Sequence, residues 1–215
     1  MHETASSQPR KESKKELQAE AARERILSAV IDCLDRYGYA ETSISRIQEA
    51  AGFSRGALTH HFPSKEEMMV VAAERLLRPT LSLRRRKHPA GAASEAVLAV
   101  DVEADIVWMW EKLVDTSEGR ALLEILVASR TDDVLRQRIA TKFARWNNAI
   151  NETLIENYGQ SGMDGQALQE FWTICRVFLR GLNTQSQFDP DDGMRKALVR
   201  RFAHAFAAQM SRPRD

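Results

Sequence analysis

The sequence predicts an all-α protein, because apolar residues recur at helical spacing in nearly every segment of the chain. Among 215 residues there are only six prolines and ten glycines, and runs of β-branched residues are scarce. Most windows therefore favour helix over strand. With 43% hydrophobic and 28% charged residues, the chain can also bury a substantial core. Its length suits one large domain, or a small domain joined to a larger one.

The first two predicted helices are separated by a glycine. The first begins near residue 20 and ends at Gly38, a common residue just after a helix. A short second helix begins at Thr42 and Ser43 and ends at Gly52. Apolar spacing in these helices and the next predicts a shared core, which consists of Ile26, Val30, Leu34, Ile47, Leu58 and Phe62.

Serines mark the start of the next two helices. Ser54 is placed to cap a helix over residues 55–62. Ser64, followed three residues later by Glu67, is a capping box for a fourth helix from residue 65 to about residue 86. Because three short helices alone are marginally stable, we expect packing against the fourth helix and the rest of the chain to stabilise them.

The remainder of the chain has five further helical patterns, separated by polar or glycine-containing breaks. They cover residues 94–116, 117–129, 132–158, 164–184 and 191–210. The predicted organisation is therefore a disordered arm over residues 1–18, a small helical domain over 19–64, and a larger helical body over 65–215.

Residues 51–65, AGFSRGALTHHFPSK, begin at the end of one predicted short helix, pass through a tight glycine-containing turn and continue into a second short helix. This is the helix-turn-helix pattern, whose second helix lies in the major groove of DNA. On that second helix Arg55 can read guanine or bind phosphate, and Gly56 permits close approach to the bases. We expect double-stranded operator DNA as the partner. The predicted contacts are Thr42, Ser43, Ser54, Arg55, Gly56, Thr59, His60, His61 and Lys65.

Charge is distributed unevenly along the chain, although its net value is only +1. Residues 1–91 have 16 lysines and arginines against 12 acids, whereas residues 92–215 have 15 against 18. Phosphate neutralisation is therefore expected in the first part. Residues 1–18 are either a DNA-contacting arm or a solvated tail. The basic run at residues 84–87 is interpreted as a cationic helix end rather than a DNA contact, because it lies about 30 Å along the helix from Lys65.

The last two predicted helices are apolar on more than one face, so they must be covered on both sides. This favours a homodimer interface built as a four-helix bundle, although an ordinary buried core would give the same pattern. The predicted interface residues are Phe171, Ile174, Phe178, Leu198, Phe202 and Phe206.

Aromatic side chains concentrated in the body predict a small-molecule pocket. The candidate pocket residues are Trp110, Phe143, Trp146, Trp172 and Arg176. Arg176 and Arg180 interrupt an apolar helix one turn apart. Each either binds an anionic ligand group or pairs with an acid or solvent at the dimer edge.

Several other functions are disfavoured. His60 and His61 are adjacent on a helix and point about 100° apart, so they cannot easily chelate one metal ion. No nucleophile–base pair, metal-ligand spacing or phosphate loop indicates an enzyme or a cofactor. No segment has the roughly 18 apolar residues that a membrane span needs. The two cysteines are interpreted as buried side chains in a reducing cytoplasm.

Residues 23–68 resemble the TetR family of bacterial transcriptional regulators. The diagnostic pieces are GYAETSI, the alanine–glycine turn, SRGAL and HHFPSKEEM. The resemblance implies a homodimer of about nine helices, whose first three bind DNA and whose others hold a ligand that moves the two heads apart. It also implies that the predicted DNA contacts, Ser43 excepted, match positions that commonly touch DNA. Thr59 departs from the family, which most often has there a longer tyrosine that usually reaches a phosphate.

The sequence therefore predicts a dimeric, ligand-responsive repressor of the bacterial cytoplasm. It would bind a palindromic operator and be released by an effector of unknown identity. The alternative is a TetR-like activator, or a regulator without a small-molecule effector.

Overall fold

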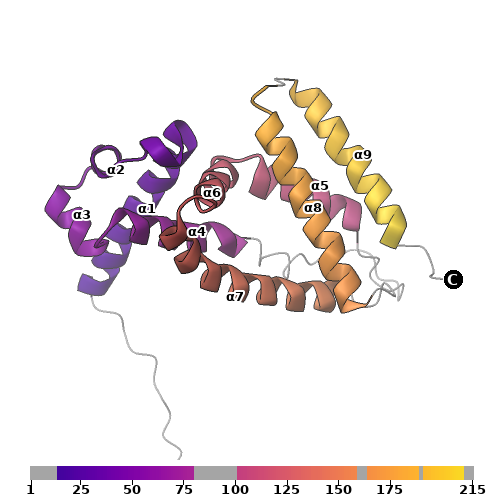
Figure 1. Ribbon diagram of the computed structural model, residues 1–215, viewed down its shortest axis with the longest axis horizontal. Helices are drawn as coiled ribbons and strands as arrows, with labels where there is room; N and C mark the ends of the chain where they lie inside the picture. The colour runs from indigo at the N-terminus through magenta and orange to yellow at the C-terminus, as the bar shows by residue number, and fades with distance from the viewer. Residues whose placement is uncertain (1–13, 80–100, 159–163, 189–190, 211–215) are drawn as a thin grey trace, which may run out of the picture.

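The computed structural model describes residues 14–79, 101–158, 164–188 and 191–210. Within these ranges the chain forms nine α-helices and one π-helical segment, and no strand, which confirms the predicted all-α fold. The elements are α1 (Lys14–Glu41), α2 (Ile44–Ala51), α3 (Arg55–His61), α4 (Lys65–Leu77), α5 (Val102–Met109), η2 (Trp110–Val114), α6 (Ser117–Ala128), α7 (Asp133–Tyr158), α8 (Gly165–Gln185) and α9 (Asp192–Met210). Figure 1 shows α1–α3 as a head at one end and α8 and α9 at the other, with α4 and α6 between them.

Local capping explains where the short helices begin and end. Ser43, Ser54 and Ser64 each accept a hydrogen bond from a backbone N–H three residues later, at 3.1–3.3 Å. Gly52 ends α2 in the left-handed conformation, with φ of 69°. These features confirm the expected boundaries of the helix-turn-helix. The Glu67 carboxylate pairs with Arg138 of α7, so this second residue of the predicted capping box also joins α4 to the body.

The head has the core that the sequence predicts. All six expected side chains have no solvent exposure: Ile26, Val30, Leu34, Ile47, Leu58 and Phe62. Burying a side chain such as Leu58 or Phe62 contributes about 1.5–3 kcal/mol. The same cluster of buried apolar side chains continues through Met68 and Met69 of α4 into the body. The head is therefore packed onto the rest of the chain.

The first helix differs from the prediction at both ends. It already includes residues 14–18, where the sequence predicts a disordered arm, and helical backbone resumes after Gly38 as far as Glu41. Gly38 interrupts the helix with φ of 72°, a conformation that other residues rarely adopt. Residues 1–13 of the expected arm and the basic run at 84–87 lie outside the described residues.

The predicted helix over residues 94–116 is divided in the structure. α5 covers only Val102–Met109, and the chain then widens into the π-helical η2. The Asp115 N–H donates to the Trp110 carbonyl at 2.8 Å, five residues back, which defines the wider turn. Thr116 then caps α6. Residues 94–100 lie outside the described ranges.

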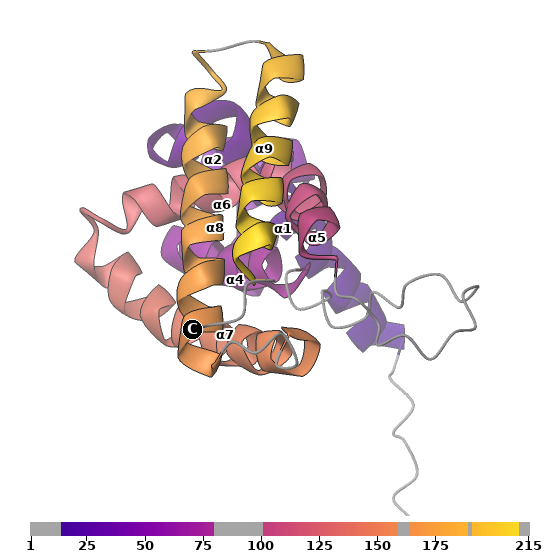
Figure 2. The ribbon, with the colours of Figure 1, turned by 90° about the vertical axis from the view of Figure 1, so that its right-hand side faces the viewer.

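The body is completed by two long helices at the end of the chain. Figure 2 shows α8 and α9 side by side, with α7 crossing beneath them. Phe178 of α8 stacks on Phe202 of α9 with ring centroids 3.9 Å apart, and Phe171 contacts Phe206 at 4.0 Å. Of the helices that the structure describes, none combines the length and apolar character needed to cross a membrane.

Candidate nucleic-acid interface and internal cavity

One side of α3 is open to solvent. Ser54 begins the helix by accepting a hydrogen bond from the Ala57 N–H at 3.2 Å. Arg55, Gly56 and His60 follow with exposed side chains or backbone. A Cβ atom added to Gly56 would meet nothing within 4 Å. The start of α3 therefore offers an exposed cation beside open space at Gly56, which suits the edge of a DNA groove.

Two other α3 residues of the predicted set are less available. The Thr59 Oγ1 lies 3.0 Å from the Arg55 carbonyl and 3.1 Å from the Gly56 carbonyl, so its hydroxyl donates to the helix itself. His61 is half-buried, with its ring edge-on to Phe53 at a centroid distance of 6.4 Å. His60 is thus the more accessible of the two histidines.

Ser43 lies at the surface, whereas Thr42 lies in the interior. Ser43 is exposed and caps α2, accepting from the Arg46 N–H at 3.3 Å. Thr42 is fully buried, and its hydroxyl donates to the Gly38 carbonyl at 2.7 Å. The structure therefore does not present the predicted contact Thr42 to DNA, because its hydroxyl satisfies a carbonyl at the break in α1.

Lys65 is half-buried at the start of α4. Its Nζ donates to the Tyr39 carbonyl at 3.0 Å and lies 4.6 Å from the centre of the Tyr39 ring. Burial lowers the pKa of Lys65 below its ordinary value. An ammonium group has three donors, so Lys65 can hold the end of α1 and still donate to a phosphate.

Two arginines of α1, which the sequence did not single out, hold α2 and α3 in place. Arg23 donates to the His61 carbonyl at 2.9 Å and lies 4.5 Å from the centre of the Phe62 ring. Arg25 donates to the Ala51 carbonyl at 3.1 Å. Each cation thus caps the negative end of a short helix, α3 or α2. The only signal in the sequence was the pair of arginines on the polar side of α1.

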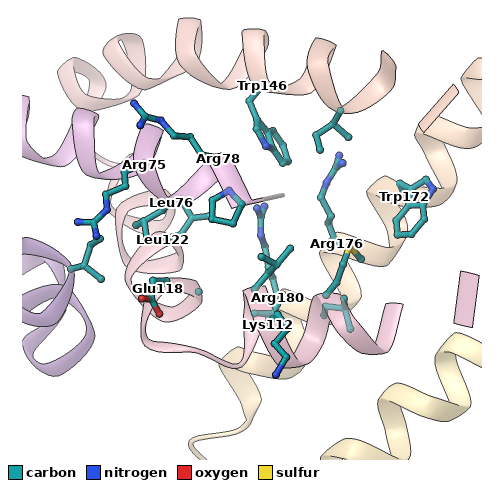
Figure 3. A pocket seen from close by; sticks show the side chains of 18 of the residues that line it. Arg75, Leu76, Arg78, Lys112, Glu118, Leu122, Trp146, Trp172, Arg176 and Arg180 are labelled. Carbon is teal, nitrogen blue, oxygen red and sulfur yellow. The ribbon is translucent and has the colours of Figure 1, made fainter. Parts of the chain in front are cut away.

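A cavity of about 410 Å³ lies inside the body. Its walls come from α1, α4, α5, η2, α6, α7 and α8 (Figure 3). Three predicted pocket residues, Trp146, Trp172 and Arg176, line it. The other two do not: Trp110 is buried in the core, and Phe143 packs against Trp146 with ring centroids 5.4 Å apart. The volume falls within the range of small-molecule sites.

The structure gives few other candidates for chemistry. Cys33 and Cys175 are buried free thiols. Burial raises the pKa of Cys33 and raises that of Cys175 to about 12, so both are neutral near pH 7. Over the ranges that the structure describes, no three histidine, cysteine, aspartate or glutamate side chains gather into a group that could hold a metal ion.

Comparison with known proteins identifies the head. Residues 26–72 match the family model of bacterial regulatory proteins, tetR family. That stretch contains all of α2 and α3, with their caps and the buried residues beneath them. This match shows that the head is a TetR-family helix-turn-helix domain. The resemblance seen in the sequence is thereby confirmed, and α3 is the second helix of that helix-turn-helix.

Individual relatives extend the similarity beyond the TetR head. A helix-turn-helix regulator of Mycobacterium bovis is 29% identical over 130 residues, so the match spans 60% of this chain and 63% of that protein. A helix-turn-helix repressor of Mycobacterium tuberculosis is 28% identical over 127 residues, 55% of this chain and 66% of that one. A transcriptional regulator from Saccharomonospora viridis, crystallised with choline, has the same fold, with a TM-score of 0.62 at 22% identity over 88% of this chain and 96% of that one.

In this chain, α6 joins the TetR-family head directly to the cavity. Arg120 of α6 forms two hydrogen bonds with the Asp35 carboxylate of α1, at 2.6 and 3.1 Å. One turn later, the Glu124 carboxylate accepts from the Tyr39 N–H at 2.9 Å. The same stretch of α6 contributes Glu118, Gly119 and Leu122 to the cavity wall. A displacement of α6 would therefore act on α1 beside the Gly38 break.

The six predicted interface residues separate into two groups. Phe171 and Phe206 are buried between α8 and α9 of the same chain, and Phe178 and Phe202 are partly covered by each other. Ile174 and Leu198 face outward instead, and so does Val177 of α8. The side chains of Ile174 and Val177 are 55% and 67% exposed. The helices α8 and α9 thus leave Ile174, Val177 and Leu198 uncovered within one chain.

Proposed function

We propose that this chain is a dimeric transcriptional repressor that binds a palindromic operator through α3 and leaves it when a small molecule occupies the cavity. The observation that carries the proposal is the combination of an exposed reading helix with a ligand-sized cavity that shares walls with the head. The relative named as a repressor and the S. viridis regulator bound to choline support the two halves of this proposal.

The chemistry of α3 suits a major groove. The Arg55 guanidinium can donate two hydrogen bonds to guanine O6 and N7, or bind a phosphate. Gly56, in open space, lets the backbone come close to the base edges. Ser43 and Ser54 lie at helix starts, where free N–H groups and the helix dipole favour phosphate.

Ligand binding can reach the head because the cavity walls belong to helices that touch it. Ile31 of α1, Leu76 of α4 and Leu122 of α6 all line the cavity. A ligand shifts the heads only if it prefers the arrangement that does not fit DNA. A compound that binds both arrangements equally would leave the operator occupied.

Dimerisation would cover the apolar surface of α8 and α9. Ile174, Val177 and Leu198 of two chains would meet in a four-helix bundle, in the way that a symmetric interface pairs one patch with itself. Two heads then bind half-sites about 34–36 Å apart, or a small multiple of that distance.

DNA recognition is tested by selecting bound fragments from the source genome and measuring their affinity. Arg55→Ala should weaken binding by about 1–3 kcal/mol, with relaxed preference at one base pair if Arg55 reads guanine. Arg36→Ala is the matched control, because Arg36 is a cation of the head that lies on α1 and pairs with Asp32 at 3.0 Å. Equal effects of both variants, or no selected sequence at all, would contradict the assignment of α3.

The interface is tested by size-exclusion chromatography with light scattering. Val177→Glu should give monomers that bind the operator weakly. Val134→Glu is the control, because Val134 is equally apolar and exposed but lies on α7. A Val177→Glu protein that remains dimeric would exclude this surface as the interface.

A further inference from the structure

The cavity has an uneven charge. Of the side chains that line it, five are basic and one is acidic, namely Arg75, Arg78, Lys112, Arg176 and Arg180 against Glu118. Arg75 is already paired with Glu24 of α1 at 3.4 Å, and Glu118 accepts a hydrogen bond from Ser117 at 2.9 Å. Arg78 and Lys112 are exposed to solvent, whereas Arg176 and Arg180 are partly buried. The excess of positive charge inside the cavity therefore centres on these two arginines of α8.

Arg176 and Arg180 lie one turn apart on α8, so their side chains leave the same side of the helix. Figure 3 shows both extending from α8 into the space beside Trp146. Arg176 donates to the Thr173 hydroxyl at 3.0 Å, and its Cζ lies 5.1 Å from the centre of the Trp146 ring. In the part of the chain that the structure describes, no hydrogen bond or ion pair reaches the Arg180 guanidinium, and no carboxylate pairs with Arg176.

This arrangement is unfavourable while the cavity holds no counter-charge. Burial lowers the pKa of Arg176, and burial together with repulsion from Arg176 lowers the pKa of Arg180 to about 10. Both groups nevertheless stay charged at pH 7. Two like charges in a largely apolar cavity cost free energy, which an anion placed between them would recover. A purely structural arginine would instead have an acid or a backbone carbonyl as its partner, as Arg23 and Arg25 do.

We propose that the cavity takes a small amphipathic oxyanion, whose acidic head group is held by Arg176 and Arg180 and whose apolar body lies against Trp146, Trp172 and Leu122. A planar guanidinium fork matches a carboxylate or phosphate with two parallel hydrogen bonds. The tryptophans and leucine provide the apolar contacts that set the shape of the body. Only the effect of this ligand on DNA, and not its binding, rests on the function proposed above.

The experiment measures binding of a matched series to the full chain without DNA, by calorimetry and by thermal shift. The series is 2-naphthoate, its neutral carboxamide, 2-naphthylmethylammonium and 2-naphthyl phosphate. We expect naphthoate to bind at least tenfold more tightly than the carboxamide and the ammonium compound, as charge-assisted hydrogen bonds require. Comparison with the phosphate shows which head group the two arginines prefer. If none of the anions binds more tightly than the carboxamide, the proposal is wrong.

Variants locate the anion. Arg180→Met should remove the preference for naphthoate over the carboxamide and should leave the melting temperature unchanged or higher, because no acid loses a partner. Arg180→Lys keeps the positive charge but lacks the planar guanidinium, so it should retain only part of the preference for naphthoate over the carboxamide. Arg145→Met is the control, because Arg145 is an exposed cation beside Trp146 that does not line the cavity. A naphthoate preference that survives Arg180→Met, or destabilisation by that variant, would overturn the assignment.

Operator binding is then measured with and without naphthoate. Anion binding that leaves operator affinity unchanged would contradict the proposed release of the repressor by ligand, but it would still support the oxyanion site. If operator affinity falls on addition of the carboxamide but not of naphthoate, the ligand-responsive repressor is supported and the oxyanion site is wrong.

Discussion

Replacing Arg120 with methionine should loosen the junction between the head and the body. Arg120 binds both oxygens of Asp35, and the two side chains are 39% and 17% exposed. The charge-assisted hydrogen bonds of such a pair contribute about 1.5–3 kcal/mol, and the partial exposure of Arg120 reduces this to about 1–2 kcal/mol. For a chain of this size, that loss lowers the melting temperature by about 2–8 °C.

A double-mutant cycle separates the pair from its surroundings. Arg120→Met, Asp35→Asn and the double variant are unfolded in urea and followed by circular dichroism. Arg120 also attracts Asp115 and Glu118, so the single substitution removes more than one interaction. The cycle isolates the coupling between Arg120 and Asp35, which we expect to be about 1 kcal/mol or more. Strictly additive variants, with a coupling below about 0.3 kcal/mol, would refute the reasoning.

Other predictions concern local packing. Gly119→Ala should destabilise the fold by about 1–3 kcal/mol, because the new Cβ would lie 2.2 Å from the Val114 carbonyl oxygen. Gly56→Ala, in open space, should instead stabilise the fold by about 0.5 kcal/mol in urea titrations while weakening operator binding. Ser54→Ala should cost about 1 kcal/mol through loss of the α3 cap, and an unchanged urea midpoint would contradict that role. Burial raises the pKa of the Cys175 thiol to about 12, so this thiol should resist Ellman's reagent at pH 8 until the chain unfolds. In the unfolded chain the same thiol ionises from about pH 9. The free energy of unfolding should therefore fall between pH 9 and pH 12.

The features predicted correctly depend on neighbours in the sequence. Ser54 caps α3, Gly52 ends α2, and the apolar spacing that includes Leu58 and Phe62 marks the core of the head. Each of these signals acts within one or two helical turns, so residue type and spacing are sufficient to reveal it. The family motif lies in this same region, which is why the TetR resemblance could be found there.

The residues that the structure places differently from the sequence prediction have partners in distant parts of the chain. Thr42 has the right type for a phosphate contact, but its hydroxyl is buried against Gly38. Phe206 has the apolar character of an interface residue, but Phe171 covers it within the same chain. Residue type predicts that such a side chain seeks a partner and cannot say which partner it finds.

Residue order along the chain determined the helices, their caps, the core of the head and the family. Tertiary packing alone decided that α6 ties Asp35 to the cavity wall, that α8 and α9 leave Val177 uncovered, and that Arg180 enters the cavity without an acid beside it. The physical reason is the separation along the chain over which each interaction acts. Capping and periodicity act over a few residues, whereas ion pairing, burial and cavities depend on which helices the folded chain brings together.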